Sequence, residues 1–491
     1  MDTLKEGLGK GSDLESMLFW VLVVFGGILS ISSFFFSFTK RSKTQTKIPS
    51  PVVPTAPCGI LEAIRSFGGT QQPTFLLKMM DQSGSDIFKL RLPIKYGGLF
   101  VVGNPKAARE VLLDRDTDKP QAFYSVFDSI SKGPTMFTRT NKDAKFHAVR
   151  KGVAPAFSSP EVKRVTRICN ERLEDWMQTV LEPKIAKNET FDPTEEMLRL
   201  LFFMVMEVAF ESDITEESEK QVRESLDLSF TELLTKDVTN PLRKMFGLFI
   251  PSRRRAVRAA TDVHGFMSKL LETYREKTDK STNNTIIKLV ANDPAKYENE
   301  HALASDMIMF TVASHESTAV QLSTILVLLA RHPEVAEKLR TELAGLDPRE
   351  WGKSAYLHCV ISESLRFFSS MPTRQAGRTF YFKDGSIVIP EGAMISIPTF
   401  LIHRNRDVFS NPDIFDPERW VNPSQEAKDA FMPFLMGTRN CMGQRLATTE
   451  LYSCVPMLIS KYKFEEVEEG ELVFNITLKY EGARLRAVKV A

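Results

Sequence analysis

Residues Phe434 to Gly443 read FLMGTRNCMG, and this stretch decides how the rest of the chain is interpreted. Its one cysteine, Cys441, follows Arg439 by two residues and lies between Gly437 and Gly443. The residues that follow, QRLATTELYSCVPMLISKY, have helical periodicity, so we expect Cys441 at the N-terminus of a helix. Backbone N–H groups and the helix dipole favour a thiolate over a thiol at such a position.

The same loop contains further groups that suit a haem with a cysteine ligand. Gly437 and Gly443 allow the backbone to approach a large flat molecule. Arg439 offers a planar cation to a carboxylate. Together with a thiolate, these features favour a haem whose axial iron ligand is Cys441. A buried structural cysteine beside a turn is the alternative.

The pattern FxxGxRxCxG, which begins at Phe434, resembles the haem-binding loop of the cytochromes P-450. The resemblance extends over roughly residues 80–491. It implies a mainly α fold with a small β region and a haem b cofactor, iron protoporphyrin IX. It also implies that Phe434, Arg439, Cys441 and Gly443 contact this cofactor, with Cys441 on the iron.

A second motif, ESLR at residues 363–366, is an i, i+3 pair of the kind that usually forms a weak ion pair on a helix surface. A strand-like segment with an IPEG turn follows it, and then the sequence DPERW, which ends at Trp420. This order is similar to the P-450 order. The resemblance implies that Glu363, Arg366 and Arg419 form a buried network with a structural role, namely to hold the haem loop.

A long buried helix is predicted near residues 296–331, where neither glycine nor proline occurs. A polar island from Thr311 to Thr318 interrupts its apolar sequence, and burial of these groups is costly unless they are hydrogen-bonded or functional. The resemblance implies that Ala313 and its neighbours bind dioxygen, with Glu316, Ser317 and Thr318 as catalytic residues. Ser317 stands where the family usually has threonine, so Thr318 is its rival for the hydroxyl role; we favour Ser317. A polar face on a partly exposed helix is the alternative.

Haem propionates require cations besides Arg439. Phe146 and Arg150 resemble the family's WxxxR helix, with phenylalanine in place of tryptophan. Arg374 resembles the arginine that follows the ExxR helix, with Arg378 as a rival, and an ordinary surface arginine is the alternative for each. The resemblance also suggests substrate contacts, all equally compatible with plain core: Phe127, Phe137, Phe310, Ala313, Met371 and Pro372.

Residues 17–38 contain no charge and would span about 33 Å as a helix, enough to cross a bilayer. A cleaved signal peptide is the alternative, but the stretch is long and the segment before it is not basic. By the positive-inside rule, the basic residues that follow place the remainder in the cytosol: Lys40, Arg41, Lys43 and Lys47. We expect a tail at 1–16, a transmembrane anchor at 17–38, a basic and Pro-rich linker at 39–57 and a haem-binding catalytic domain at 58–491. Residues 242–255 mix apolar and basic side chains, which is typical either of a segment that touches a membrane surface or of an ordinary transition from core to surface.

The composition fits a large globular enzyme, with 491 residues of which 43% are hydrophobic and 26% charged. The net charge of +2 gives no sign of nucleic-acid binding, and the five scattered cysteines argue against a disulfide framework. We expect a single-pass protein of the endoplasmic reticulum membrane with a cytosolic catalytic domain. It would insert one oxygen atom from dioxygen into a lipophilic small molecule, using electrons from a separate NADPH-dependent reductase.

Two other classes of protein remain open. One is a haem-thiolate isomerase or lyase that rearranges a hydroperoxide without a reductase. The cluster from Glu316 to Thr318 argues against it, because that chemistry has no use for a proton relay. The other is a non-enzymatic haem protein or membrane scaffold.

Overall fold

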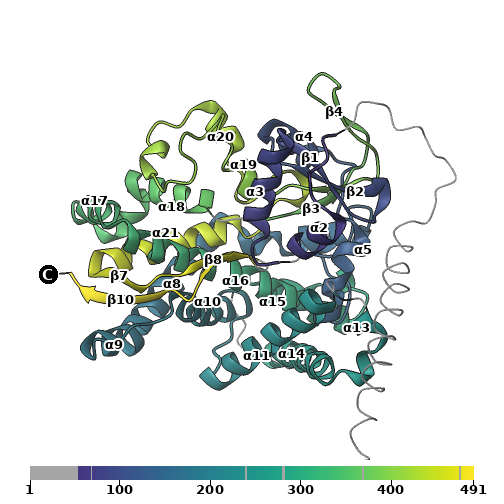
Figure 1. Ribbon diagram of the computed structural model, residues 1–491. Helices are drawn as coiled ribbons and strands as arrows, with labels where there is room; N and C mark the ends of the chain where they lie inside the picture. The colour runs from purple at the N-terminus through teal and green to yellow at the C-terminus, as the bar shows by residue number, and fades with distance from the viewer. Residues whose placement is uncertain are drawn as a thin grey trace, which may run out of the picture.

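The computed structural model describes residues 53–67, 69–237, 240, 242–278, 282–367, 370–474 and 477–490. The predicted anchor at 17–38, the tail before it and most of the linker lie outside these residues. Within the described part, helices dominate and short strands gather in two regions (Figure 1). The predicted mainly α fold with a small β region is therefore confirmed.

The longest helix, α16 (Glu300–Arg331), runs through the middle of the molecule (Figure 1). Its N-cap Asn299 accepts a hydrogen bond from the N–H of Ala302. It packs against α10 (Pro193–Phe210) and α14 (Pro251–Glu276). Although α16 is long and apolar enough to span a membrane, 72% of its most hydrophobic window is buried inside the protein. Such burial is expected of a helix that is apolar on most sides and forms the core.

Hydrophobic periodicity predicts further helices near 142–157, 160–182, 216–235, 333–344, 353–368 and 442–461, and the other long helices lie close to these ranges. Side-chain N-caps begin several of them, such as Asp143, which accepts from the N–H of Lys145, and Asp192, which accepts from Thr194 and Glu195. These helices are α7 (Ala144–Val153), α8 (Val162–Trp176), α11 (Glu216–Ser229), α17 (Pro333–Ala344), α18 (Ala355–Phe367) and α21 (Gln444–Lys461).

A four-stranded sheet has the order β1-β2-β6-β3. Its strands are β1 (Ile87–Arg91), β2 (Gly98–Val102), β6 (Met394–Ser396) and β3 (Thr373–Gln375). β2 pairs parallel with β6, and β3 pairs antiparallel with β6 so that Arg374 lies opposite Ile395. The sheet thereby joins the first hundred residues to the segment after the ExxR helix.

Three two-stranded ribbons complete the β structure. They are β4 (Phe380–Phe382) with β5 (Ile387–Ile389), β7 (Tyr462–Glu468) with β10 (Arg484–Lys489), and β8 (Glu471–Phe474) with β9 (Leu478–Glu481). The β9 strand packs against α16, which matters for the site described below.

The end of the expected linker is part of the folded domain. The N–H of Lys89 in β1 donates to the carbonyl of Pro54 at 2.8 Å, and the N–H of Ala56 donates to the carbonyl of Lys89 at 2.9 Å. Proline is tolerated here because the segment lies along a sheet edge. The chain therefore joins the fold a few residues before the expected boundary at residue 58.

Candidate functional site

The Cys441 loop runs from a short 3-10 turn, η11 (Gly437–Arg439), to the start of α21. The N–H of Cys441 donates to the carbonyl of Phe434 at 2.9 Å, which closes the loop. Cys441 is the exposed cysteine, although protein surrounds it on most sides, whereas the other four cysteines are buried. Its thiol is therefore the one that can reach a ligand.

Two effects oppose each other on the Cys441 thiol. Burial is the larger effect and holds its pKa above the ordinary value, while the backbone N–H groups of Gly443 and Gln444 and the Arg150 guanidinium act in the opposite direction. The two N–H groups belong to the start of α21, so the helix end stabilises negative charge on the sulfur. This arrangement suits a thiolate that ligates a metal.

The two glycines of the loop differ in the space that surrounds them. Gly437 has φ +75°, and a Cβ there would lie 2.1 Å from the carbonyl oxygen of Leu112 in α4 (Pro105–Leu113). The close approach at Gly437 is therefore to α4. A Cβ on Gly443 would lie 3.8 Å from the Cys441 sulfur, an ordinary contact distance. A Cβ at Gly443 would therefore touch the sulfur without overlapping it.

Glu363 is the centre of a buried network. Its carboxylate accepts from Arg366 at 2.8 and 2.9 Å and from the Nε of Arg419 at 2.9 Å, and the Glu363 and Arg366 side chains have 0% exposure. The indole Nε1 of Trp420 donates to Glu363 at 2.8 Å, and the N–H of Asp416 donates at 3.0 Å. A buried ion pair is tolerated only when its remaining hydrogen-bonding capacity is satisfied, as it is here.

His403 extends this network toward the Cys441 loop. Arg366 donates to the carbonyl of His403 at 2.8 Å, and the Nδ1 of His403 lies 3.2 Å from the carbonyl of Arg366. The Nε2 of His403 accepts from the N–H of Met432 at 3.1 Å, two residues before Phe434. Burial and the nearby Arg366 lower the pKa of His403 to about 3, which keeps the ring neutral. No spacing in the sequence signals this histidine.

Four cations gather between β3, α7 and the Cys441 loop: Lys119, Arg150, Arg374 and Arg439. Burial, then Arg374 and Arg439, hold the pKa of Lys119 well below its ordinary value. Burial also lowers the pKa of Arg439 to about 10, while Asp118, whose carboxylate lies 3.2 Å from it, acts in the opposite direction. Among the described residues, Asp118 is the carboxylate paired with this cluster, so an excess of positive charge remains and the cluster fits the two propionates of a haem. Lys119 is not marked by any sequence pattern.

Arg374 and Arg378, the two candidates for a propionate contact, lie in different surroundings. Arg374 is buried on β3 and belongs to the cation cluster, whereas Arg378 forms surface ion pairs with Glu110 at 2.8 Å and Asp114 at 3.1 Å. Arg150 donates to the side-chain oxygen of Asn440 at 2.6 Å, beside Cys441.

Arg439 makes many contacts within the protein. Its guanidinium lies 3.6 Å from the ring centroid of Phe146, and its Nε donates to Asn141 at 2.5 Å. The Nη groups donate to Asp118 and to the carbonyls of Met136 and Arg139. A guanidinium has five N–H groups, so these partners leave one for a propionate.

The polar island on α16 divides into two faces. Ala313 is exposed and Ser317 half-buried, whereas His315 and Thr318 are buried. The hydroxyl of Ser317 donates to the carbonyl of Ala313 at 2.8 Å. On a helix, adjacent residues point about 100° apart, so only one of Ser317 and Thr318 can line the open face. That residue is Ser317.

Glu316 lies between α16 and the β8–β9 ribbon. Its carboxyl accepts from the hydroxyl of Thr477 at 3.4 Å. Burial raises its pKa to about 7, with Asp227 of α11 adding to the rise and Lys479 opposing it. A carboxyl with this pKa can take up and release a proton near neutral pH.

Thr318 lies beside a second buried carboxyl, Glu450 of α21. Glu450 is 1% exposed, and within the described part of the chain neither of its oxygens has a hydrogen-bond partner that meets normal geometry. Burial raises its pKa to about 8, which the nearby Thr318 hydroxyl partly opposes. The sequence shows Glu450 only as a polar residue in a helix.

The structure places the proposed substrate contacts on several different elements. The rings of Phe127 and Phe137 meet edge to face, with centroids 5.5 Å apart. Phe310 and Ala313 are on α16, whereas Met371 packs against a different cluster that includes Val101 and Leu401.

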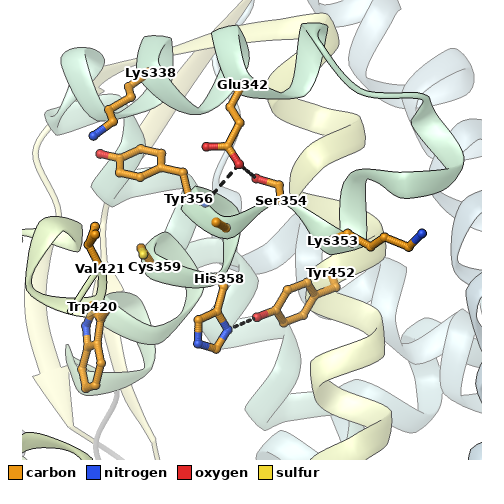
Figure 2. A pocket seen from close by; sticks show the side chains of 12 residues that line it. Lys338, Glu342, Lys353, Ser354, Tyr356, His358, Cys359, Trp420, Val421 and Tyr452 are labelled. Carbon is orange, nitrogen blue, oxygen red and sulfur yellow. Dashed lines mark hydrogen bonds between the residues drawn. The ribbon is translucent and has the colours of Figure 1, made fainter. Parts of the chain in front are cut away.

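A separate cavity of about 650 Å³ lies on the outer side of α18 (Figure 2). His358 faces Tyr452 across it, with a 2.6 Å hydrogen bond to the phenol, and Glu342 accepts from Ser354 (Figure 2). Neither Cys441 nor any member of the cation cluster lines this cavity. It is therefore not the space for the haem.

An accessible thiol at a helix start, a loop held by a buried Glu–Arg–Arg network and a group of under-compensated cations define a haem-thiolate site. The Cytochrome P-450 family model matches residues 53–479. Cytochrome P-450 3A56 of Fundulus heteroclitus is 24% identical over 368 residues, which cover 69% of this chain and 72% of that protein. Cyclooctat-9-en-7-ol 5-monooxygenase of Streptomyces melanosporofaciens is 26% identical over 388 residues, with coverages of 75% and 80%.

The haem domain of a cytochrome P-450DA mutant superposes with a TM-score of 0.75 at 18% sequence identity, covering 90% of this chain and 98% of that structure. The chain belongs to the cytochrome P-450 family. It is a haem-binding monooxygenase.

Proposed function

We propose that this enzyme inserts one oxygen atom into a lipophilic small molecule, with electrons from a separate NADPH-dependent reductase. The observation that carries the proposal is the accessible Cys441 sulfur, with the backbone N–H groups of Gly443 and Gln444 directed at it. When bound, the haem supplies activation of dioxygen and transfer of one of its oxygen atoms.

The residues around the loop would hold the haem in place. Cys441 would ligate the iron, and Phe434 and Gly443 would lie against the ring. Arg150, Arg374, Arg439 and Lys119 would bind the propionates, since the group as a whole carries an excess of positive charge. The Glu363–Arg366–Arg419 network would fix the loop without touching the reacting atoms.

The polar residues of α16 would deliver protons. Ser317 lies on the open face of the helix and is the hydroxyl that we assign to the dioxygen groove. Glu316, whose pKa is about 7, would exchange protons with solvent. Thr318 is buried beside Glu450, which supports a role behind the groove rather than in it.

A membrane location would bring the enzyme close to lipophilic substrates. Apolar side chains are exposed in residues 245–249, including Leu248 at 80% and Phe249 at 81%. The exposed cations Lys244, Arg254 and Arg255 flank them, and such a mixture suits an anionic lipid surface. Together with the predicted anchor at 17–38, this surface supports placement on the cytosolic face of the endoplasmic reticulum membrane. The reductase would dock on the basic face near the Cys441 loop.

The test is turnover with ¹⁸O₂ and a purified NADPH-dependent reductase. The panel should include a long-chain fatty acid and cyclooctat-9-en-7-ol, the compound named in one relative. We expect one ¹⁸O atom in each product molecule and no product without reductase. Rearrangement of a hydroperoxide without reductase, and no ¹⁸O incorporation, would support the isomerase alternative instead.

A further inference from the structure

We propose that Asp306 is a positioning residue that fixes the loop over the substrate space and ties it to the Cys441 loop. The loop in question is residues 134–139, PTMFTR, here called the roof segment. The inference deepens the proposed function, on which it rests, by assigning a residue that influences which substrates fit. It was not signalled by any motif.

Both backbone polar groups of Met136, its N–H and its carbonyl, are hydrogen-bonded to other parts of the protein. Its N–H donates to the Oδ1 of Asp306 at 2.7 Å, and Asp306 is a residue of α16 with 3% exposure. Its carbonyl accepts from the Nη1 of Arg439 at 3.4 Å, and the carbonyl of Arg139 accepts from the Nη2 of Arg439 at 2.5 Å. The roof segment is therefore the physical bridge between the central helix and the arginine of the Cys441 loop.

The roof segment contains its own turn, which links its residues to one another. The N–H of Thr135 donates to the hydroxyl of Thr138 at 2.9 Å, and the N–H of Thr138 donates back to the hydroxyl of Thr135 at 3.3 Å. Phe137 lies inside this turn, and its carbonyl accepts from Lys119. A displacement at Met136 would therefore also displace the Phe137 ring.

Phe137 is the part of the roof segment that a substrate would meet. Its ring packs edge to face on Phe127 and on Tyr124, with centroid distances of 5.5 and 5.8 Å. Aromatic clusters of this kind have definite geometries, so a shift of one ring changes the shape of the wall that they form. Asp306 would thereby influence the size of ligand that reaches the haem.

A second contact shows that the roof segment is fitted closely to α16. His301, one turn before Ser305, has its Nε2 2.7 Å from the carbonyl of Lys132. A Cβ on Gly133 would lie 3.3 Å from the hydroxyl of Ser305. His301 thus holds the chain at Lys132, two residues before the roof segment, and Asp306 holds the segment itself at Met136. The hydrogen bond from Met136 to Asp306 is buried, and its loss would leave the N–H of Met136 without a partner.

The test is amide hydrogen exchange at Met136 in the haem-loaded protein. In the wild type we expect this amide to exchange at least 100-fold more slowly than in an unstructured chain, although it lies outside any helix or strand. Asp306→Ala should speed its exchange about tenfold or more, which corresponds to loss of one hydrogen bond. Asp306→Asn keeps an acceptor oxygen and should stay within about threefold of wild type.

Ser305→Ala is the matched control, because the adjacent Ser305 hydroxyl is buried and donates within its own helix, to the carbonyl of His301 at 2.9 Å. It should leave Met136 exchange unchanged. A second readout is the ratio of dissociation constants for imidazole and 4-phenylimidazole, two iron ligands of different size. We expect Asp306→Ala to change this ratio at least threefold and Asp306→Asn to leave it near the wild-type value.

Exchange of Met136 at the unstructured rate in the wild type would overturn the proposal, and that result needs no variant. An Asp306→Ala protein that binds haem yet shows unchanged exchange and an unchanged ratio would also overturn it. Neither measurement uses turnover or a reductase. Failure of this inference is therefore distinguishable from failure of the proposed function.

Discussion

The indole Nε1 of Trp420 donates a 2.8 Å hydrogen bond to the buried carboxylate of Glu363. The family pattern that DPERW resembles usually has phenylalanine at the position of Trp420, and phenylalanine has no hydrogen-bond donor. In this chain the Glu363 carboxylate therefore has an additional partner besides Arg366 and Arg419. The extra partner is a feature of this protein's own network.

Trp420→Phe should lower the free energy of unfolding by about 1–3 kcal/mol, because a buried charged acceptor loses a donor. Trp351→Phe is the matched control, since its indole donates at 3.0 Å to the neutral carbonyl of Leu343 in a less buried place. Denaturant unfolding of both variants measures the difference. An equal or larger loss of unfolding free energy in Trp351→Phe would show that the hydrogen bond to Glu363 stabilises the protein no more than one to a neutral carbonyl.

Arg366→Ala should prevent haem incorporation rather than only slow turnover. Removal of Arg366 leaves the fully buried Glu363 short of its main countercharge, at a cost of roughly 3–5 kcal/mol. The substitution also removes the Arg366 hydrogen bond to the carbonyl of His403. His403 would then be held less firmly in the position from which its Nε2 accepts from the N–H of Met432. The measurement is haem content per polypeptide, with Arg378→Ala as the surface control. A haem-replete Arg366→Ala protein would mean that the network does not hold the loop.

Much of this framework is predictable from sequence, because its signals are patterns within short stretches of the chain. Cys441, Glu363, Arg366 and Arg419 occur in motifs of fixed spacing, and the long helices have strong periodicity. Helices α2 (Ile60–Phe67), α3 (Gln72–Ser83) and α4 (Pro105–Leu113) were not predicted. They are short, and Pro73 and Pro105 near the starts of α3 and α4 are easily taken for loop signals, although proline is favoured in a first helical turn.

The residues that sequence reasoning misses are those whose roles arise from packing. Lys119, Asp306, His403 and Glu450 look like ordinary polar residues in the chain. Each becomes notable only because segments far apart in sequence bury it beside a particular partner. Asp306 and Met136, for example, are 170 residues apart.

Glu450 should make stability fall as pH rises. Folding raises its pKa from 4.5 to about 8, so the folded protein binds more protons than the unfolded chain between these values. Its contribution is therefore most favourable at the acidic end and is lost as pH increases toward 8. Glu450→Gln should match wild type near pH 5 and exceed it near pH 8, by up to about 4 kcal/mol.

Denaturant unfolding gives the free energy of unfolding of the wild type and of Glu450→Gln at pH 5 and pH 8. Because the other titratable groups are the same in both proteins, their contributions cancel in the difference between the two free energies. The same offset between variant and wild type at pH 5 and pH 8 would show that Glu450 does not have a raised pKa.

Ser317→Ala should keep a normal haem spectrum but release more hydrogen peroxide per NADPH consumed, because the hydroxyl on the open face of α16 is lost. Ser317→Thr should remain coupled. Thr318→Val should change coupling less, since Thr318 is buried beside Glu450. The ratio of product to NADPH measures each effect. Normal coupling in Ser317→Ala together with uncoupling in Thr318→Val would move the role to Thr318.

The central claim is that Cys441 ligates the haem iron as a thiolate, and the spectrum of the reduced, carbon-monoxide-bound protein tests it most directly. The wild type should show the strongly red-shifted Soret band of thiolate ligation. Cys441→Ala should lose this band, and Cys441→His should give a histidine-type spectrum, while Cys454→Ala, a change at a buried cysteine, should retain the red-shifted band. An unchanged red-shifted band in Cys441→Ala would contradict the claim.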